Sequence, residues 1–379
     1  MKIVVAIDSF KGSLTTMQAA EAIREGALRA CPEAEVYTSP LADGGEGTAE
    51  ALTAALGGET VSLTVRDPLG RPISATYGYV AESKTAIMEM AAAAGLPLLS
   101  PEERCPMAAS TYGVGQMIAD AMEKGARRFL LGIGGSATND GGLGMLKALG
   151  FSFFNKDGDL IGEGAGALRN LHAISKENVH PLLDSCEFLV ACDVQNPLCG
   201  ENGCSAVFSP QKGARPETIP QMDEWLAAYA EKTKALFPSA DPNRPGSGAA
   251  GGLGFALCSY LNAQLVPGVS LVLSFTHLAE QVKDADLVIT GEGRLDGQSI
   301  MGKAPIGVAK LAKEFCKPVV AFCGCVGKEA AACNAHGIDA FFPILQAPCT
   351  LAEAMDEENA YANLRATAEQ AVRLFCIRI

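Results

Sequence analysis

The fold is predicted most directly from one glycine-rich stretch, Gly132-Ile133-Gly134-Gly135-Ser136-Ala137-Thr138-Asn139-Asp140-Gly141-Gly142. The apolar run Phe129-Leu130-Leu131 precedes it, and Leu143-Gly144-Met145-Leu146 follows it at helical spacing. This order predicts a strand, a glycine turn and a helix start. Glycines let a ligand approach the backbone, and N–H groups at a helix start favour an anion such as phosphate. The alternative is a plain turn in which Thr138 or Asn139 caps the helix.

Similar strand–turn–helix units stand near both ends of the chain. The run Ile3-Val4-Val5-Ala6-Ile7 leads into residues 8–13 and then into a helix with a capping box, Thr15 with Gln18. A second short strand leads into the acidic glycine turn at 42–48. Near the other end, a strand at 285–290 precedes what reads as a long glycine-rich loop at 291–299. Such repeated units predict a doubly wound parallel sheet.

The middle of the chain has a different pattern. Residues 59–80 alternate apolar and polar around Asp67-Pro68-Leu69-Gly70, which predicts a β-hairpin, and residues 151–161 suggest a second one. The apolar run 269–275 is interpreted as another strand.

We therefore expect the α/β fold class. A doubly wound parallel-sheet domain would be formed by both chain ends, residues 1–58 and 280–379. An inserted second α/β domain, residues 59–279, would contain the antiparallel strands.

Composition narrows the classes of partner. The chain has 379 residues, is 48% hydrophobic and has a net charge of −13, which argues against nucleic acid or an anionic membrane surface. Its start does not follow the pattern of a secretion signal, and we find no apolar run long enough to span a bilayer. We expect a cytoplasmic protein whose 13 cysteines are reduced and mostly buried rather than zinc ligands. A homodimer stays open as its assembly state.

The residues at the predicted strand ends indicate phosphoryl transfer. This chemistry needs N–H groups and lysines for phosphates, carboxylates for Mg²⁺, and a carboxylate that orients the attacking hydroxyl. The four histidines lie outside these loops, so an aspartate would have to act as the base. The strand-end residues with these functions are Asp8, Ser9, Lys11, Asp43, Asp193, Glu292, Asp296 and Lys303.

Two other classes compete with a kinase. Gly132-x-Gly134-x-x-Ala137 matches the dinucleotide fingerprint and would make the protein a nicotinamide-dependent hydroxy-acid dehydrogenase. However, no strand about 20 residues later ends in the acidic ribose partner. A protein that binds a sugar acid without turnover is the other alternative, although a pure anion binder gains nothing from the carboxylates at 193, 292 and 296.

The combination of motifs resembles the bacterial glycerate kinases, a family with two α/β domains. The resemblance covers nearly the whole chain in the right order. It rests on residues 7–13, 42–48, 132–142, 191–198, 248–254 and 290–296.

The resemblance implies ATP- and Mg²⁺-dependent phosphorylation of D-glycerate, most simply at the 2-hydroxyl, with 3-phosphoglycerate as the other product to consider. It also implies an active site in the cleft between the two domains. On this basis Asp193 would orient the hydroxyl as the base, with Lys11 and Asp296 as further catalytic residues. Glu292 and Asp296 would bind the metal. Residues expected to contact glycerate are Asp8, Ser9, Asp43, Arg66, Arg71 and Arg294. Those expected to contact the nucleotide are Gly134, Gly135, Ser136, Asn139, Gly251, Gly252 and Lys303.

Overall fold

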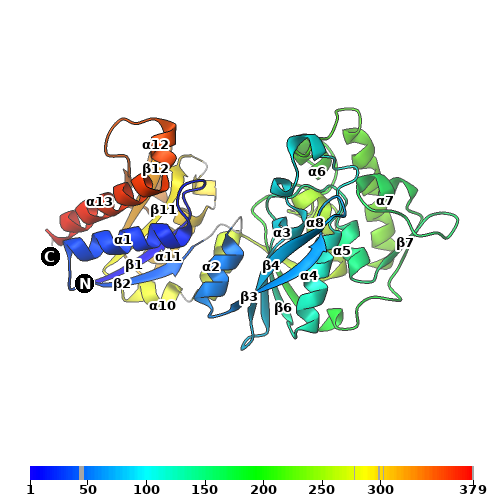
Figure 1. Cartoon of the computed structure of the whole chain (residues 1–379), viewed down its shortest axis with the longest axis horizontal. Coiled ribbons are helices and arrows are strands. Elements are labelled where there is room, and N and C mark those ends of the chain that lie inside the picture. Colours follow the sequence, from blue (N-terminus) through cyan, green and yellow to red (C-terminus); the bar gives the residue numbers. More distant parts are fainter. Residues whose placement is uncertain (42–46, 277, 298, 302, 378–379) are drawn as a thin grey trace. The chain divides into compact units, whose positions relative to one another are not determined.

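The computed structural model describes residues 1–41, 47–276, 278–297, 299–301 and 303–377 (Figure 1). The chain forms two compact units, each described by itself. The first comprises Met1–Asp43, Ala54–Leu56 and Pro267–Ile379, and the second comprises Gly44–Thr53 and Gly57–Val266. The domain boundaries drawn from the sequence, and the active-site cleft expected with them, stay predictions.

The first unit contains a five-stranded parallel sheet built from both chain ends. Its order is β13 (Ala340–Pro343), β12 (Val319–Val326), β11 (Leu287–Leu295), β1 (Lys2–Ile7) and β2 (Glu35–Pro40). The order of the strands along the chain reverses between β1 and β11, as in other doubly wound sheets. Ile3 to Ile7 are fully buried, because a parallel sheet of this kind is covered on both faces.

Helices cover this sheet. Helix α1 (Thr16–Ala30) begins at Thr15 with the predicted capping box, in which the side chains and backbones of Thr15 and Gln18 bond reciprocally. It packs beside α13 (Glu357–Cys376), against the sheet face that carries Ile3, Val5 and Ile7 (Figure 1). Helix α11 (Ala304–Glu314) packs against β1 and β11, and α9 (Gly268–Phe275) and α10 (Leu278–Lys283) pack against α11.

Two sequence predictions for this unit are wrong. Residues 269–275 form α9 instead of a strand, because a short apolar run fits either element and Pro267 immediately before it suits a helix start. The expected loop at 291–299 is largely strand, since β11 continues to Leu295 and pairs with β12 as far as Val326. The glycines there permit close strands: a Cβ on Gly291 would lie 2.0 Å from the carbonyl oxygen of Phe322.

The second unit contains a mixed six-stranded sheet. Its order is β10 (Gln264–Val266), β9 (Glu187–Ala191), β6 (Arg128–Gly132), β5 (Thr85–Glu89), β4 (Pro72–Val80) and β3 (Glu59–Arg66). Strands β3 to β5 pair antiparallel and β5, β6, β9 and β10 pair parallel, which confirms the first predicted hairpin. The second predicted hairpin is confirmed only in part. Its turn closes with the Asn155 N–H donating to the Asp159 carbonyl oxygen, and Phe154 bridges Leu160, but the regular partner of β7 (Ser152–Phe154) is β8 (Ala173–Ser175).

The helices of the second unit surround a large core. They include α3 (Ala91–Ala94), α4 (Tyr112–Glu123), α5 (Leu143–Ala148), α6 (Cys204–Phe208), α7 (Ile219–Leu236), α8 (Ala249–Tyr260) and the first six residues of α2 (Thr48–Ala55). Phe129 of β6 and Phe188 of β9 stack in the core with ring centroids 4.7 Å apart.

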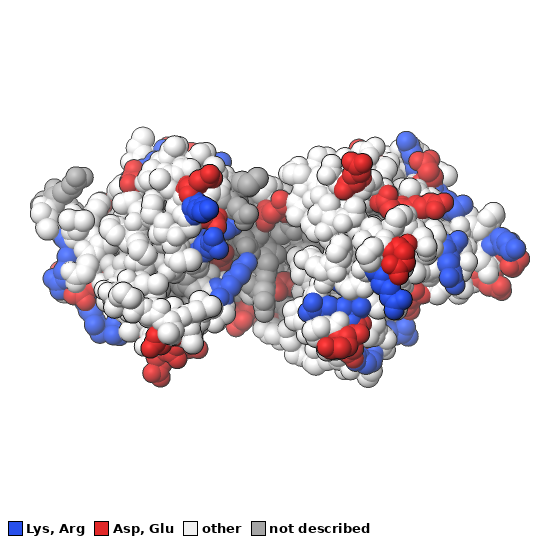
Figure 2. Space-filling model, turned by 90° about the horizontal axis from the view of Figure 1, so that it is seen from above, with Lys and Arg blue, Asp and Glu red and all other residues white. Residues whose placement is uncertain are grey.

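The surface and the cysteines bear on the expectations from composition. On the face drawn in Figure 2, acidic and basic side chains are interspersed among uncharged residues on each unit. Among the described residues, no helix is both long and apolar enough to cross a membrane. The cysteines are free thiols, but the expectation that they are mostly buried is wrong: three are buried (Cys204, Cys323 and Cys333), and four are exposed (Cys105, Cys316, Cys325 and Cys349).

Candidate active site

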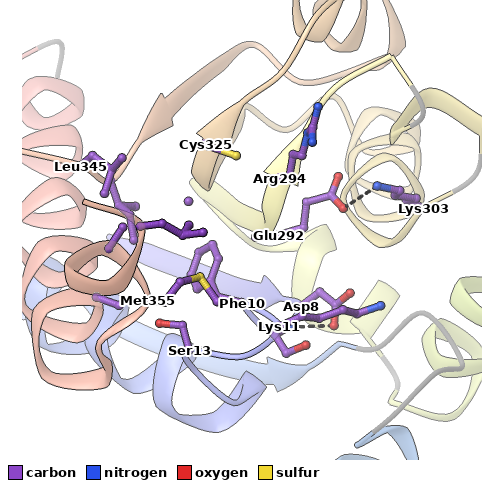
Figure 3. Close-up of a pocket in the computed structure, with 17 residues that line it drawn as sticks. Asp8, Phe10, Lys11, Ser13, Glu292, Arg294, Lys303, Cys325, Leu345 and Met355 are labelled. Atoms are coloured by element: carbon purple, nitrogen blue, oxygen red, sulfur yellow. Dashed lines mark hydrogen bonds and ion pairs between the residues drawn. The ribbon is translucent and has the colours of Figure 1, made fainter. Parts of the chain in front are cut away.

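The first unit has a pocket of about 390 Å³ beyond the carboxyl ends of β1 and β11. Ligands of doubly wound sheets bind at this place, because the chains leaving the two strands diverge there and open a crevice. One end of the pocket is charged and the other is apolar (Figure 3). The charged end is lined by predicted site residues: Asp8, Ser9, Lys11, Glu292, Arg294 and Lys303.

Asp8 and Ser9 are fixed by the end of β1. The Asp8 N–H donates to the Gly291 carbonyl oxygen at 3.0 Å, so the backbone of Asp8 continues the ladder toward β11. The Ser9 N–H donates to Asp8 Oδ1 at 2.7 Å, which orients the carboxylate. Asp8 is buried despite its charge, and buried charges require such partners.

Glu292 occupies the matching position on β11. Its Oε2 lies 3.2 Å from Lys303 Nζ (Figure 3). Its Oε1 accepts a hydrogen bond from Ser299 Oγ. Burial raises the pKa of the Glu292 carboxyl, while Ser299 and Lys303 act in the opposite direction. A partly desolvated carboxylate beside a lysine, in a pocket, is typical of a functional site.

Asp296 and Arg294 form a pair next to this arrangement. Arg294 Nε lies 3.1 Å from Asp296 Oδ2, and Arg294 lines the pocket whereas Asp296 does not. The structure therefore brings Glu292, rather than Asp296, toward the cavity.

The described part of the chain holds no group of three or more metal-ligating side chains. Mg²⁺ is commonly held by one or two carboxylates together with substrate phosphates and water. Asp8 and Glu292 in the pocket fit this smaller requirement.

In the second unit, other predicted residues meet at the carboxyl ends of β6 and β9. Gly132 of β6 and Ala191 of β9 are register partners, so the segments that follow them leave the sheet at the same edge. Gly134, Gly135 and Asp193 are exposed there. These residues are accessible to a ligand.

The polar residues that follow in the glycine turn are buried and bonded to the protein itself. Asn139 Nδ2 donates to Ser205 Oγ at 2.9 Å. Asp140 accepts hydrogen bonds at 2.8–3.1 Å from the Thr111 N–H and hydroxyl and from the N–H groups of Gly142 and Gly144. Burial raises the pKa of the Asp140 carboxyl, and these four donors oppose that effect. Helix α5 then begins at Leu143 with Gly142 as its N-cap, so neither Thr138 nor Asn139 caps it.

Lys212 is the residue at this turn that the sequence did not reveal. Its Nζ donates to Ser136 Oγ and to the Thr138 carbonyl oxygen, both at 2.7 Å, and the residue is only 2% exposed. Burial lowers the pKa of Lys212 to about 8. Lys212 belongs to the polar stretch Pro210-Gln211-Lys212-Gly213, which begins with proline and ends with glycine. Such a stretch is typical of a solvated loop.

The second glycine cluster packs directly against the first. The Gly141 N–H donates to the Gly251 carbonyl oxygen at 2.9 Å. A Cβ on Gly251 would lie 2.1 Å from the Thr138 carbonyl oxygen, and one on Gly252 would lie 2.9 Å from Gly141 Cα. Both glycines are buried and have positive φ. This packing accounts for them without a ligand, and their predicted contact with the nucleotide stays a prediction.

The remaining predicted residues are placed as follows. Arg66 pairs with Glu163 at 3.2 Å, and its guanidinium lies over the Tyr112 ring. Arg71 pairs with Asp67 and Glu103, each at 2.6 Å. Both arginines are thus engaged by neighbours in the second unit. Asp43 lies outside the described residues.

The dinucleotide fingerprint does not have the context that it needs. In that motif the glycines open a helix directly, so that its N-terminus faces the pyrophosphate. Here Ala137 is buried and its N–H donates to the Ala94 carbonyl oxygen, while the helix begins only at Leu143. The dehydrogenase interpretation is not supported.

Comparison with known proteins agrees with this. The model of the Glycerate kinase family matches residues 3–376. A glycerate kinase of Haemophilus influenzae is 46% identical over 378 residues and covers 100% of both chains. A glycerate 2-kinase of Escherichia coli is 45% identical, covering 96% of this chain and 95% of its own. A crystal structure described as that of a glycerate kinase 2 from Salmonella typhimurium LT2 matches with a TM-score of 0.91 at 43% identity, over 100% of this chain and 98% of that one.

Proposed function

The chain belongs to the glycerate kinase family, a family of phosphotransferases, and from this we propose that it transfers the γ-phosphoryl group of ATP to the 2-hydroxyl of D-glycerate. The products would be 2-phosphoglycerate and ADP. The relative named glycerate 2-kinase supports the choice of the 2-hydroxyl.

The observation that carries the proposal is the charged end of the pocket. Lys11, Arg294 and Lys303 line it together with Asp8 and Glu292. The three cations suit the anionic groups of the reaction, which are the glycerate carboxylate and the phosphates. The two carboxylates suit a divalent cation. Phosphoryl transfer depends almost entirely on such positioning and charge stabilisation.

The proposed step is a direct in-line displacement. The 2-hydroxyl oxygen attacks the γ-phosphorus, the bond from this phosphorus to the bridging oxygen breaks, and ADP leaves with that electron pair. We assign Asp193 to orient the hydroxyl and accept its proton, as its exposed position beyond β9 allows. Lys11 and Lys303 would balance the phosphate charge. Gly134, Gly135 and the Ser136 backbone remain proposed phosphate contacts.

Mg²⁺ is the proposed companion of ATP. When bound, it would neutralise charge on the phosphates. Glu292 is the better placed of the two predicted ligands because it lines the pocket, and Asp8 is the second carboxylate available there. Asp296, paired with Arg294, would act on the site through that arginine.

The test is ³¹P NMR of the product formed from D-glycerate, ATP and Mg²⁺, with authentic 2- and 3-phosphoglycerate as standards. We expect the 2-phosphoglycerate signal. A 3-phosphoglycerate signal would overturn the regiochemistry and leave the kinase, and no phosphorylated product from folded protein would overturn the glycerate assignment. A cytoplasmic location and a homodimer remain proposals, and light scattering would test the dimer.

A further inference from the structure

The apolar end of the pocket has no role in the proposed handling of glycerate. It is lined by Phe10, by Ile344 and Leu345 after β13, and by Leu351 and Met355 of α12 (Leu351–Met355). Figure 3 shows Leu345 and Met355 on the side of the cavity opposite Arg294 and Lys303. The pocket thus presents an apolar surface and a cationic surface to the same ligand.

Phe10 and Ile344 belong to the buried core of the first unit, but the other three side chains do not. Leu351 is 79% exposed, and Leu345 and Met355 are each 37% exposed. An exposed large apolar side chain contributes little to folding, and a group of them lining a cavity marks a binding surface.

The helix that carries Leu351 is fixed at its start. Thr350 caps α12, and Glu353 Oε2 accepts a hydrogen bond from the Thr350 N–H at 2.8 Å. Asp356 then caps α13 directly after Met355, accepting from the Asn359 N–H at 3.0 Å. Leu351 and Met355 are therefore presented on anchored backbone, which lowers the entropic cost of binding.

The size of the pocket also calls for more than glycerate. A volume of about 390 Å³ falls in the range of sites for drug-sized ligands, and a three-carbon acid would fill only its charged end. A ligand that fits both ends has a multiply charged anionic part joined to a flat apolar part. Within the proposed reaction, the nucleotide has this chemistry.

We infer that the apolar end of the pocket receives the purine base of the nucleotide, between Leu345, Leu351 and Met355, with the phosphates directed toward Lys11 and Lys303. The inference rests on the proposed function, since it takes ATP as the donor. It places the base on the first unit and not on the glycine turn of the second unit.

The first test compares Leu351→Asn with a matched control, Leu374→Asn, which alters a leucine that is 60% exposed on α13 and does not line the pocket. Calorimetry would measure the binding of ADP and of inorganic tripolyphosphate. For Leu351→Asn we expect ADP affinity to fall about tenfold, as for loss of one apolar contact, with tripolyphosphate affinity and the KM for glycerate unchanged. The control should match the wild type. Unchanged ADP affinity in Leu351→Asn, or no ADP binding by the wild type, would overturn the inference.

A second test does not depend on a variant. Wild-type protein is photolabelled with 8-azidoadenosine triphosphate, digested and mapped by mass spectrometry. Label within residues 344–360 that ADP suppresses supports the inference, and suppressible label within 132–142 overturns it. The two proposals fail separately. If glycerate is phosphorylated and the label lies within 132–142, only the proposed base site is contradicted. If the label lies within 344–360 and there is no turnover, only the proposed reaction is contradicted.

Discussion

The pocket after β1 and β11 and the glycine turn after β6 are both strand-end regions rich in polar residues, but they use these residues differently. In the pocket, Asp8, Glu292 and Lys303 line a cavity. In the turn, Asp140 and Asn139 are buried and bonded to the protein. The comparison teaches that polar residues in a glycine-rich turn can serve internal packing, while a less conspicuous strand end opens into a pocket.

The largest effect is expected for substitution of Asp193. This substitution tests whether the second unit contributes a catalytic residue. Asp193→Asn should lower kcat by about 10³-fold through loss of the carboxylate that orients the hydroxyl. Its fold should be intact, since Asp193 is exposed. Steady-state kinetics and circular dichroism would measure both, with the exposed turn variant Asp157→Asn as control. Near wild-type turnover would contradict the assignment of Asp193, and Asp8 in the pocket would become the next candidate for the reacting carboxylate.

The pocket itself is tested by Lys303→Met. We expect kcat/KM to fall about 100-fold, because a charge-assisted contact with phosphate is lost. Loss of Lys303 should also raise the pKa of Glu292 further, so the acid limb of the pH–activity profile should move to higher pH. Lys310→Met changes an exposed lysine on α11, the helix that follows Lys303, and should leave both unchanged. Equal behaviour of the two variants would contradict the assignment of Lys303.

The close packing of the two glycine clusters is tested by Gly251→Ala. Gly251 has φ +67°, and a Cβ there would meet the Thr138 carbonyl oxygen at 2.1 Å. We expect a loss of about 2 kcal/mol or more in the free energy of unfolding, from backbone strain plus the clash. Gly158→Ala is the matched control, since Gly158 has φ +85° with nothing within 4 Å of its Cβ. Denaturant unfolding that shows the same loss for both would mean that the close packing is unimportant.

The smallest effect concerns Lys212 and pH. The pKa of Lys212 is about 8 in the folded protein. Between pH 8 and the ordinary pKa of a lysine, Lys212 therefore binds fewer protons in the folded protein than in the unfolded chain. Its contribution to stability therefore rises with pH, on the order of 1 kcal/mol per pH unit in this window. Denaturant unfolding at several pH values would measure the free energy of unfolding of wild type and of Lys212→Met. The difference between them reports on Lys212, because the cysteines that also titrate in this range are the same in both proteins. A difference that stays flat with pH would show that Lys212 titrates normally.

The sequence predicts the parts of this molecule that local chemistry determines. The buried strand before Asp8, the capping box at Thr15 and the hairpin around Gly70 depend on near neighbours in the chain. The same local pattern misled at residues 269–275, where an apolar run fits a helix as well as a strand.

The site is predictable only in part, because its contacts join distant segments. Glu292 and Asp8 could be named as strand-end carboxylates, but their meeting in one pocket depends on the pairing of β1 with β11. Lys212 could not be found, since its burial arises from contact with a turn more than seventy residues earlier in the sequence.

The sheet built from both chain ends has a consequence for biosynthesis. Strand β1 needs β11 beside it, and α1 needs α13. The ribosome makes residues 44–266 in between, which takes roughly 10 to 45 seconds at typical bacterial and eukaryotic elongation rates. During that time the second unit can complete its core, while the apolar strand β1 can pair with β2 but not with β11. One edge of β1 therefore stays open in the nascent chain during this interval, and an open edge of an apolar strand can pair with other chains.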